Sequence, residues 1–211
     1  MEYTPSTRFG LKDPAAIMDA FHQIGTETLQ EVLRASSAPE AEKTLRTWGI
    51  NAAAEMIGRS TQTIRQLEQK NGLLGEPSIL ENGKRYYTLE RINQMRDELG
   101  TRFKRSPLSE VIILAVSNFK GGVAKTTTSI LLAQKCALDG LRVLVIDLDP
   151  QASFTLLFGL MPDIHLIGDD TVATAMLDDP SDITRVIRKT YFTGIDLIPG
   201  NSALNYRIFH A

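Results

Sequence analysis

One stretch decides the fold of this chain: Ser117-Asn118-Phe119-Lys120-Gly121-Gly122-Val123-Ala124-Lys125-Thr126-Thr127-Thr128. Directly before it, residues 111–116 form an apolar, β-branched run that predicts a fully buried strand. After it, apolar residues recur at helical spacing from Thr127 to Leu138 and predict a helix. A strand, a glycine-containing turn ending in Lys-Thr, and a helix form the layout that holds nucleotide phosphates.

Each residue type in this stretch has a physical reason to be there. Gly121 and Gly122 let the backbone curl, so that successive N–H groups point inward. The helix N-terminus contributes partial positive charge, Lys125 contributes a full charge, and the Thr126 hydroxyl can bind magnesium. We therefore expect nucleotide to be bound by the following residues: Lys120, Gly121, Gly122, Val123, Ala124, Lys125, Thr126 and Thr127.

The standard phosphate-loop pattern is not met, because it requires glycines where this chain has Phe119 and Ala124. The Lys-Gly-Gly-x-x-Lys-Thr run that begins at Lys120 resembles instead the deviant P-loop (deviant Walker A) of the ParA/MinD superfamily. That resemblance implies that Lys120 reaches across a dimer to the partner's nucleotide, and that Lys120 and Lys125 are catalytic. Most members have glycine at the position of Ala124. We expect alanine to be tolerated there if its φ is negative, and a positive φ would count against this.

A second predicted buried strand, residues 142–146, ends in Asp147-Leu148-Asp149-Pro150-Gln151. Two carboxylates at positions i and i+2 project to the same side of a strand, which here is the ligand crevice beside the phosphate loop. Phosphoryl transfer needs a carboxylate near magnesium and an acceptor that orients the attacking water. Asp-x-Asp-Pro-Gln is also the second signature of the ParA family. The resemblance implies that Asp149 orients or activates the water, as a catalytic residue, and that Asp147 joins Thr126 at the metal.

The preceding part of the chain carries different signals. The predicted elements are short helices at 41–48, 52–57 and 61–70, a hairpin at 79–87 around Asn82-Gly83, and a helix at 89–99 that Thr88 caps. The helices at 52–57 and 61–70, joined by a turn at Gly58, make a helix-turn-helix. Residues 59–105 hold ten Lys and Arg against six Asp and Glu, although the whole chain has a net charge of −2. This local excess indicates an anionic partner.

Residues 51–99 resemble the MerR-type winged helix, a mainly α domain. The resemblance is carried by Ser60, Thr63, Ile64, Arg65 and Glu68 on the second helix and by Arg85, Tyr86, Tyr87 and Thr88 in the wing. We expect DNA to be contacted by the following residues: Ser60, Thr61, Gln62, Thr63, Arg65, Gln66, Lys84, Arg85 and Tyr86. A winged helix that is purely structural, or that binds protein, stays open as an alternative.

The sequence predicts three domains. Residues 1–38 contain an amphipathic helix near 14–34 that either packs on its own domain or pairs with a second subunit. Residues 39–107 form the winged helix-turn-helix domain with a basic linker that ends at Pro107. Residues 108–211 form the N-terminal part of an α/β P-loop domain with a mostly parallel sheet. The family continues into an apolar strand ending in Asp (Walker B), which is not found after residue 201. The chain is therefore expected to be truncated, a fragment of a larger protein, or else a natural short form that binds nucleotide poorly.

Other classes of protein are not indicated. One cysteine and three scattered histidines give neither a disulfide nor metal-ligand spacing. No apolar run approaches the roughly 18 residues of a membrane span, and the N-terminus has no export signal. We expect a cytoplasmic, nucleoid-associated protein.

The resemblance implies a plasmid or chromosome partition protein. It would be an ATPase that uses ATP/ADP and Mg²⁺, forms a homodimer, binds operator and non-specific DNA, interacts with a centromere-binding ParB-like protein and represses its own operon. A nucleotide-responsive transcriptional regulator without significant ATP turnover is the alternative. A membrane-placing ATPase of the MinD sort is disfavoured, because a winged helix precedes the P-loop and no amphipathic tail is present.

Overall fold

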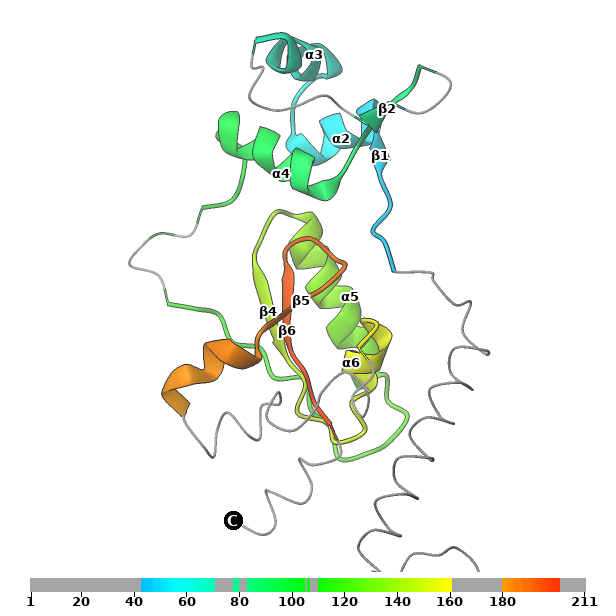
Figure 1. The fold of residues 1–211 in the computed structure, drawn as a ribbon, viewed down its shortest axis with the longest axis vertical. Helices are drawn as coiled ribbons and strands as arrows, with labels where there is room; N and C mark the ends of the chain where they lie inside the picture. Colours follow the sequence, from blue (N-terminus) through cyan, green and yellow to red (C-terminus); the bar gives the residue numbers. More distant parts are fainter. Residues whose placement is uncertain are drawn as a thin grey trace, which may run out of the picture. The chain divides into compact units, whose positions relative to one another are not determined.

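The structure, a computed structural model, describes residues 43–70, 78–79, 83–104, 106, 110–160 and 180–201 (Figure 1). The predicted domain 1–38, with its helix at 14–34, lies outside these residues. Two three-stranded sheets organise the described part, with the strand orders β1-β3-β2 and β4-β6-β5. The first sheet and its helices lie before residue 104, and the second sheet and its helices lie after residue 110.

The first half consists of β1 (Trp48–Gly49), α2 (Ile50–Ile57), α3 (Thr61–Lys70), β2 (Ser78–Ile79), β3 (Arg85–Tyr87) and α4 (Leu89–Glu98). The two predicted helices joined by a turn are confirmed. Helix α2 ends at Gly58, whose φ of 73° is a left-handed conformation that glycine adopts without a Cβ clash. Helix α3 follows Ser60, whose Oγ accepts a hydrogen bond from Thr63 N at 3.2 Å and so caps the helix.

Strand β3 lies between β1 and β2 and is antiparallel to both, with Trp48 opposite Tyr87 and Ser78 opposite Tyr86. The predicted hairpin is therefore confirmed in its strand pairing. The predicted helix at 41–48 is wrong, since residues 43–47 have no regular structure and Trp48 is a strand residue. Trp48 is 6% exposed, and an aromatic side chain packs well on a pleated surface. Cross-strand pairing has outweighed the helical spacing.

Helix α4 begins at its predicted cap, Thr88, whose Oγ1 accepts a hydrogen bond from Arg91 N at 3.2 Å. Apolar residues of α3 and α4 face the core, since Ile64, Ile92 and Met95 have no exposed surface. These side chains hold α3 and α4 in one packed unit with the first sheet.

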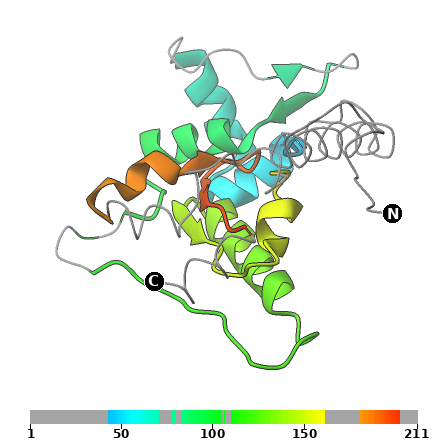
Figure 2. The same cartoon turned by 60° about the horizontal axis from the view of Figure 1, so that its bottom comes forward.

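The second half consists of α5 (Lys125–Leu138), β4 (Val143–Ile146), α6 (Ser153–Leu157), the 3₁₀ helix η3 (Pro180–Val186), β5 (Arg188–Lys189) and β6 (Ile195–Ile198). Strands β4 and β6 are parallel, and β5 is antiparallel to β6 on its other side. Helix α5 runs alongside this sheet (Figures 1 and 2). The half is an α/β unit, as predicted, but its sheet is mixed, and β5 was not expected from the sequence.

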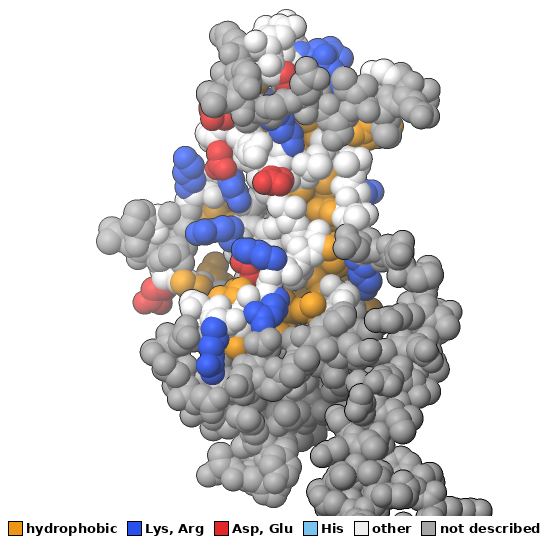
Figure 3. All heavy atoms as spheres, in the orientation of Figure 1, with side chains coloured by type: hydrophobic (Ala, Val, Ile, Leu, Met, Phe, Trp, Pro, Cys, Tyr) orange, Lys and Arg blue, Asp and Glu red, His pale blue; other side chains and the backbone are white. Residues whose placement is uncertain are grey.

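Residues 111–116 are not the buried strand that the sequence predicts. They have no regular structure, and Ile112 and Ile113 are 84% and 88% exposed. Strand β4 is half-open as well, with Leu144 and Ile146 exposed by 48% and 46%. A strand is stabilised by a neighbour that takes up its N–H and C=O groups, and no strand within the described ranges pairs with this segment or with the outer edge of β4. Hydrophobic side chains accordingly reach the surface (Figure 3).

One hydrophobic core includes side chains from both halves. Trp48 of β1, Met95 of α4, Ala137 of α5 and Leu197 of β6 belong to the same cluster of buried residues. Residues from before and after residue 107 contribute to this cluster, and the domain division near that residue stays a prediction. In the part of the chain that the structure describes, no helix is long and apolar enough to cross a membrane.

Candidate functional site

The glycine-rich loop leads directly into α5. Residues 119–124 are all exposed, and Gly122 has a φ of 71°. A Cβ on Gly121 or Gly122 would have nothing within 4 Å. The loop therefore leaves open space around its glycines, as a phosphate cradle requires.

Two lysines border this loop. Lys125 is the first residue of α5, and its Nζ donates to Lys120 O at 3.4 Å, a long hydrogen bond. Lys120 is exposed, and its N–H donates to Asn118 Oδ1 at 2.9 Å. Thr126 is half-buried and Thr127 is exposed in the first turn of the helix. A phosphate in the loop would meet the N–H groups at the start of α5 and the charge of Lys125.

Ala124 adopts the left-handed conformation, with φ 60° and ψ 28°. This counts against the prediction that alanine is tolerated at this position, because a Cβ in that conformation costs roughly 1–2 kcal/mol. Within the described ranges, the other non-glycine residue with positive φ is Ala152, with φ 49°. Ala152 stands at the start of α6, directly after the Asp147–Gln151 loop. Backbone strain clusters at ligand sites, and here it marks both helix starts that border the candidate site.

Ala124→Gly is expected to raise the free energy of unfolding by about 1 kcal/mol, because glycine reaches this φ without strain. Urea denaturation of the two proteins measures the difference. The matched control is Ala133→Gly, inside the same helix, where glycine should instead cost about 1 kcal/mol. A loss of stability in both variants would contradict the strain at Ala124.

Asp147 lies at the end of β4, is 6% exposed, and accepts hydrogen bonds on both carboxylate oxygens. Oδ1 accepts from Asp149 N at 3.2 Å, and Oδ2 accepts from Thr155 N at 2.9 Å and Thr155 Oγ1 at 2.7 Å. Thr155 is fully buried in α6, and its hydroxyl accepts in turn from Gly200 N at 3.0 Å. This network holds the ends of β4 and β6 against α6.

Asp149 has different surroundings. It is exposed, and its Oδ1 accepts from Gln151 N at 2.9 Å. The two carboxylates that the sequence places on one side thus differ in kind: Asp147 is built into a buried network, and Asp149 is open to solvent.

Sequence reasoning missed Thr155 and Gly200 as parts of this site. A Cβ on Gly200 would stand 2.7 Å from Asp147 O, so the turn after β6 can approach this closely only as glycine. The next residue, Asn201, is 9% exposed, and its Oδ1 is buried with no hydrogen-bond partner in the described part. The Pro199-Gly200 pair at the end of β6 was the available signal for Gly200. For Thr155, no pattern in the sequence points to Asp147.

The glycine-rich loop and the Asp147–Gln151 loop lie at the same end of the second half, because β4 runs back along α5 after the turn at Gly140 (Figure 1). Thr126 and Asp147 stay the residues predicted to bind metal. Among the described residues, no group of three or more His, Cys, Asp or Glu side chains could hold a metal ion. A magnesium ion at this end would therefore take most of its ligands from phosphate and water, as Mg²⁺ commonly does.

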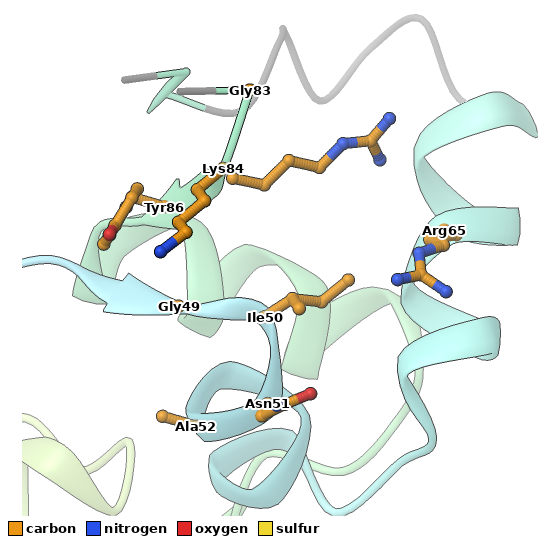
Figure 4. A pocket seen from close by; sticks show the side chains of 9 residues that line it. Gly49, Ile50, Asn51, Ala52, Arg65, Gly83, Lys84 and Tyr86 are labelled. Carbon is orange, nitrogen blue, oxygen red and sulfur yellow. The ribbon is translucent and has the colours of Figure 1, made fainter. Parts of the chain in front are cut away.

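A cavity of about 590 Å³ lies in the first half, between α3, the β2–β3 hairpin and the start of α2 (Figure 4). Its lining residues are Gly49, Ile50, Asn51, Ala52, Arg65, Gly83, Lys84, Arg85 and Tyr86. Figure 4 shows Arg65 approaching it from α3 and Lys84 from the hairpin, so that cations border it from two elements. The structure thus brings together Arg65, Lys84, Arg85 and Tyr86, which the sequence predicts to contact DNA.

The other residues predicted to contact DNA lie on α3 or just before it. Gln62 and Gln66 are exposed, and Thr61 is half-buried. Ser60 and Thr63 bond to each other, with 3.0 Å between Oγ and Oγ1, and so help to fix the start of α3. Their contact with DNA stays a prediction.

An ion pair ties the hairpin to α3. Arg85 Nη1 lies 2.6 Å from Glu68 Oε2, and the Glu68 side chain is only 7% exposed. Burial, with the Glu68 carboxylate nearby, raises the pKa of Tyr87 to about 12. Burial also lowers the pKa of Arg91, whereas the Glu68 carboxylate acts in the opposite direction and raises it. Glu68 was not among the predicted contacts, and the structure gives it the role of holding Arg85, and hence the hairpin, in place.

The comparisons with known proteins agree with the two motifs. The family described as "AAA domain" matches residues 111–207. The chain is 40% identical over 173 residues to Protein SopA of Escherichia coli (strain K12), covering 80% of the chain and 44% of SopA. It is 38% identical over 177 residues to Putative replication protein A of Rhizobium rhizogenes, covering 79% of the chain and 43% of that relative. A solved "Partition Protein" resembles it with a TM-score of 0.50 at 24% identity, over 88% of this chain and 53% of that one, which supports the fold alone.

The chain spans less than half the length of the two curated relatives that it matches. The matched residues 111–207 contain both the Lys120–Thr126 loop and the Asp147–Gln151 loop. The motif resemblance and the overall similarity therefore point to the same group of proteins. Over the part of these proteins that it covers, the chain resembles the partition proteins of the ParA/SopA type in the ParA/MinD family.

Proposed function

We propose that the protein takes part in ATP-dependent DNA partition: it binds and hydrolyses ATP, dimerises and binds DNA. The observation that carries the proposal is the open, exposed glycine-rich loop at the start of α5, with Lys125 held over it by a long hydrogen bond. A cation in that position is available to a phosphate, because little is lost when it leaves its carbonyl partner.

The loop fits the phosphates of ATP or ADP. Phosphate oxygens need N–H donors and positive charge, and residues 120–127 offer both where the chain enters α5. The exposure of Lys120 supports the role that the family resemblance implies, in which this lysine reaches the nucleotide of a second copy of the chain. That role requires a homodimer.

Bound magnesium would neutralise the charge that develops on the phosphates. We assign its binding to the Thr126 hydroxyl and to Asp147. Since Asp147 already accepts hydrogen bonds from Asp149 and Thr155, it would act through a magnesium-bound water. Asp149, which is open to solvent, would orient or activate the attacking water.

The first half of the described residues is proposed to be a DNA-binding winged helix-turn-helix domain within residues 39–107. Helix α3 presents Gln62 and Gln66 to solvent, and such side chains suit base edges in a major groove. Lys84 and Arg85 of the hairpin border the cavity beside α3 and suit phosphates, which position the protein on DNA. A winged helix that binds protein instead of DNA is the alternative for this half.

The further partners follow from the family. We propose that a ParB-like centromere-binding protein stimulates hydrolysis, and that binding to operator DNA represses the protein's own operon in the cytoplasm. ATP hydrolysis, measured for the chain alone, with DNA, and with such a partner, tests the proposal. We expect turnover that rises with DNA or partner. Absence of both nucleotide binding and turnover would contradict the proposed function.

A nucleotide-responsive regulator without significant turnover is the second candidate. The favouring observation is Asp147, whose two oxygens are taken up in the structural network with Asp149 and Thr155. Such a site can sense a nucleotide without hydrolysing it. Tight binding of fluorescent ADP, with no turnover under any of the conditions above, would favour this candidate.

Arg65→Ala is expected to weaken DNA binding by about 1–3 kcal/mol if Arg65 reads bases from α3. Gel shifts with operator DNA at fixed salt measure the effect. The control is Arg142→Ala, which removes an exposed arginine from the other half of the molecule and should leave the shift unchanged. Equal shifts for wild type and Arg65→Ala would remove the assignment of α3 as the DNA-reading helix.

A further inference from the structure

A buried arginine lies where α4 meets α5. Arg96 is 4% exposed, and its Nε and Nη2 donate to Met56 O at 3.1 and 2.8 Å. Its Nη2 also donates to Leu138 O at 2.8 Å, and its Nη1 donates to Asn93 Oδ1 at 2.7 Å. Met56 is in the last turn of α2, and Leu138 is the last residue of α5. One guanidinium therefore joins the C-terminal ends of two helices.

A second arginine makes a parallel link. Arg102 Nε donates to Gly140 O at 2.8 Å, just past the end of α5, and Arg102 Nη1 pairs with Asp97 Oδ2 at 2.8 Å. Asp97 belongs to α4, so this side chain also connects the two halves. Arg96 and Arg102 together are called here the arginine clamp.

The chemistry of helix ends explains why arginine serves here. The last carbonyls of a helix have no partners within the helix and carry partial negative charge. A guanidinium offers five N–H donors in a planar arrangement, enough to satisfy α2 and α5 at once. Burial lowers the pKa of Arg96, the direction expected for a cation withdrawn from water. The carbonyl and amide oxygens around it replace that water.

Gly140 shows how closely the halves fit. Its φ is 91°, and a Cβ there would stand 3.1 Å from Arg96 Nη1 and 3.4 Å from Arg102 Cγ. The turn after α5 thus needs glycine both for its backbone conformation and for the approach of the clamp.

We propose that the arginine clamp couples nucleotide binding at the start of α5 to the stability of the α2–α3 pair. This rests on the proposed function, in which the start of α5 holds phosphate and α3 contacts DNA. Helix α5 has 14 residues, so it carries the effect over about 21 Å. A ligand that binds only the folded helix stabilises whatever unfolds together with it. By linkage, DNA binding should strengthen nucleotide binding to the same degree.

The tryptophan of the chain provides the readout. Trp48 is the one tryptophan in the sequence, and it is buried in β1 of the first half. Saturating Mg-ADP, at about 100 times its Kd, should raise the Tm recorded by Trp48 fluorescence by roughly 5 °C or more. Arg102→Gln removes the link from Asp97 to Gly140 O at a partly exposed position, and should show less than half of this shift.

The control is Arg59→Gln, whose arginine bonds the adjacent Gly58 O, and which should keep the wild-type shift. Arg96→Lys, which keeps the charge but loses the planar donors, should reduce the shift as Arg102→Gln does. Fluorescent ADP binding, measured directly on each variant, separates a loss of ADP binding from a loss of coupling. Full Trp48 shifts in both clamp variants, with ADP bound, would overturn the coupling and leave the proposed function intact. A wild type that binds no ADP would overturn both.

Discussion

Replacing Asp147 by alanine is expected to lower the free energy of unfolding by about 3 kcal/mol. The substitution leaves the N–H groups of Asp149 and Thr155 and the Thr155 hydroxyl without their acceptor. An unsatisfied buried donor costs about 1–3 kcal/mol, and bonds to a charged partner lie at the upper end. Thr155 has no exposed surface, so water does not reach it without local opening. Urea denaturation followed by circular dichroism measures the loss.

Asp149→Ala is the matched control for this prediction. Asp149 lies two residues further on in the same loop but is exposed, so the variant should stay within about 0.5 kcal/mol of wild type. Its expected loss is in ATP turnover instead. Similar stability losses in the two variants would show that the Asp147 network does not hold the ends of β4 and β6 together.

Lys125→Ala is expected to weaken nucleotide binding on the order of 100-fold. The variant removes the full positive charge over the loop, and a hydrogen bond to a charged group is worth about 1.5–3 kcal/mol, with each tenfold in Kd equal to about 1.4 kcal/mol. Stability should change little, because the bond that Lys125 makes to Lys120 O is long, at 3.4 Å. A fluorescent ADP titration measures the affinity, with urea denaturation alongside it.

Variants of two further lysines test whether the loss of affinity is specific to Lys125. Lys135→Ala removes a lysine from the same helix that pairs on the surface with Asp139, and its ADP affinity should match wild type. Lys120→Ala should keep the affinity of a single chain and lose turnover, if this lysine acts on the partner's nucleotide. Equal affinities for Lys125→Ala and Lys135→Ala would contradict the assignment of the loop as the phosphate site.

Much of the first half follows from signals that act within a few residues. Ser60 caps α3 and Thr88 caps α4 through hydrogen bonds to N–H groups three residues ahead, and Gly58 ends α2 in a left-handed turn. Such interactions need no distant partner, so the sequence shows them directly. The helix after the phosphate loop follows in the same way from its apolar spacing.

The incorrect predictions for residues 41–48 and 111–116 share one cause. The conformation of each segment depends on a neighbour that is far away in the sequence. Trp48 fits a helical pattern but lies in a strand, because Tyr87 is there to pair with it. Residues 111–116 have the composition of a buried strand and are exposed, because no described strand pairs with them. The composition of a segment indicates which conformation it adopts when other residues pack against it. It does not identify those residues.

The sequence by itself determined the chemistry of the candidate site: the Lys120–Thr126 loop, the two aspartates at the end of β4, and the basic helix and hairpin. Only the tertiary structure decided what each group is engaged with. It buried Asp147 against Thr155, placed Arg85 on Glu68, and set Arg96 between the ends of α2 and α5. The physical reason is that hydrogen bonding and desolvation depend on the atoms that surround a group in space. Those atoms come here from residues far apart in the sequence, as in the bond between Gly200 and Thr155, which are 45 positions apart.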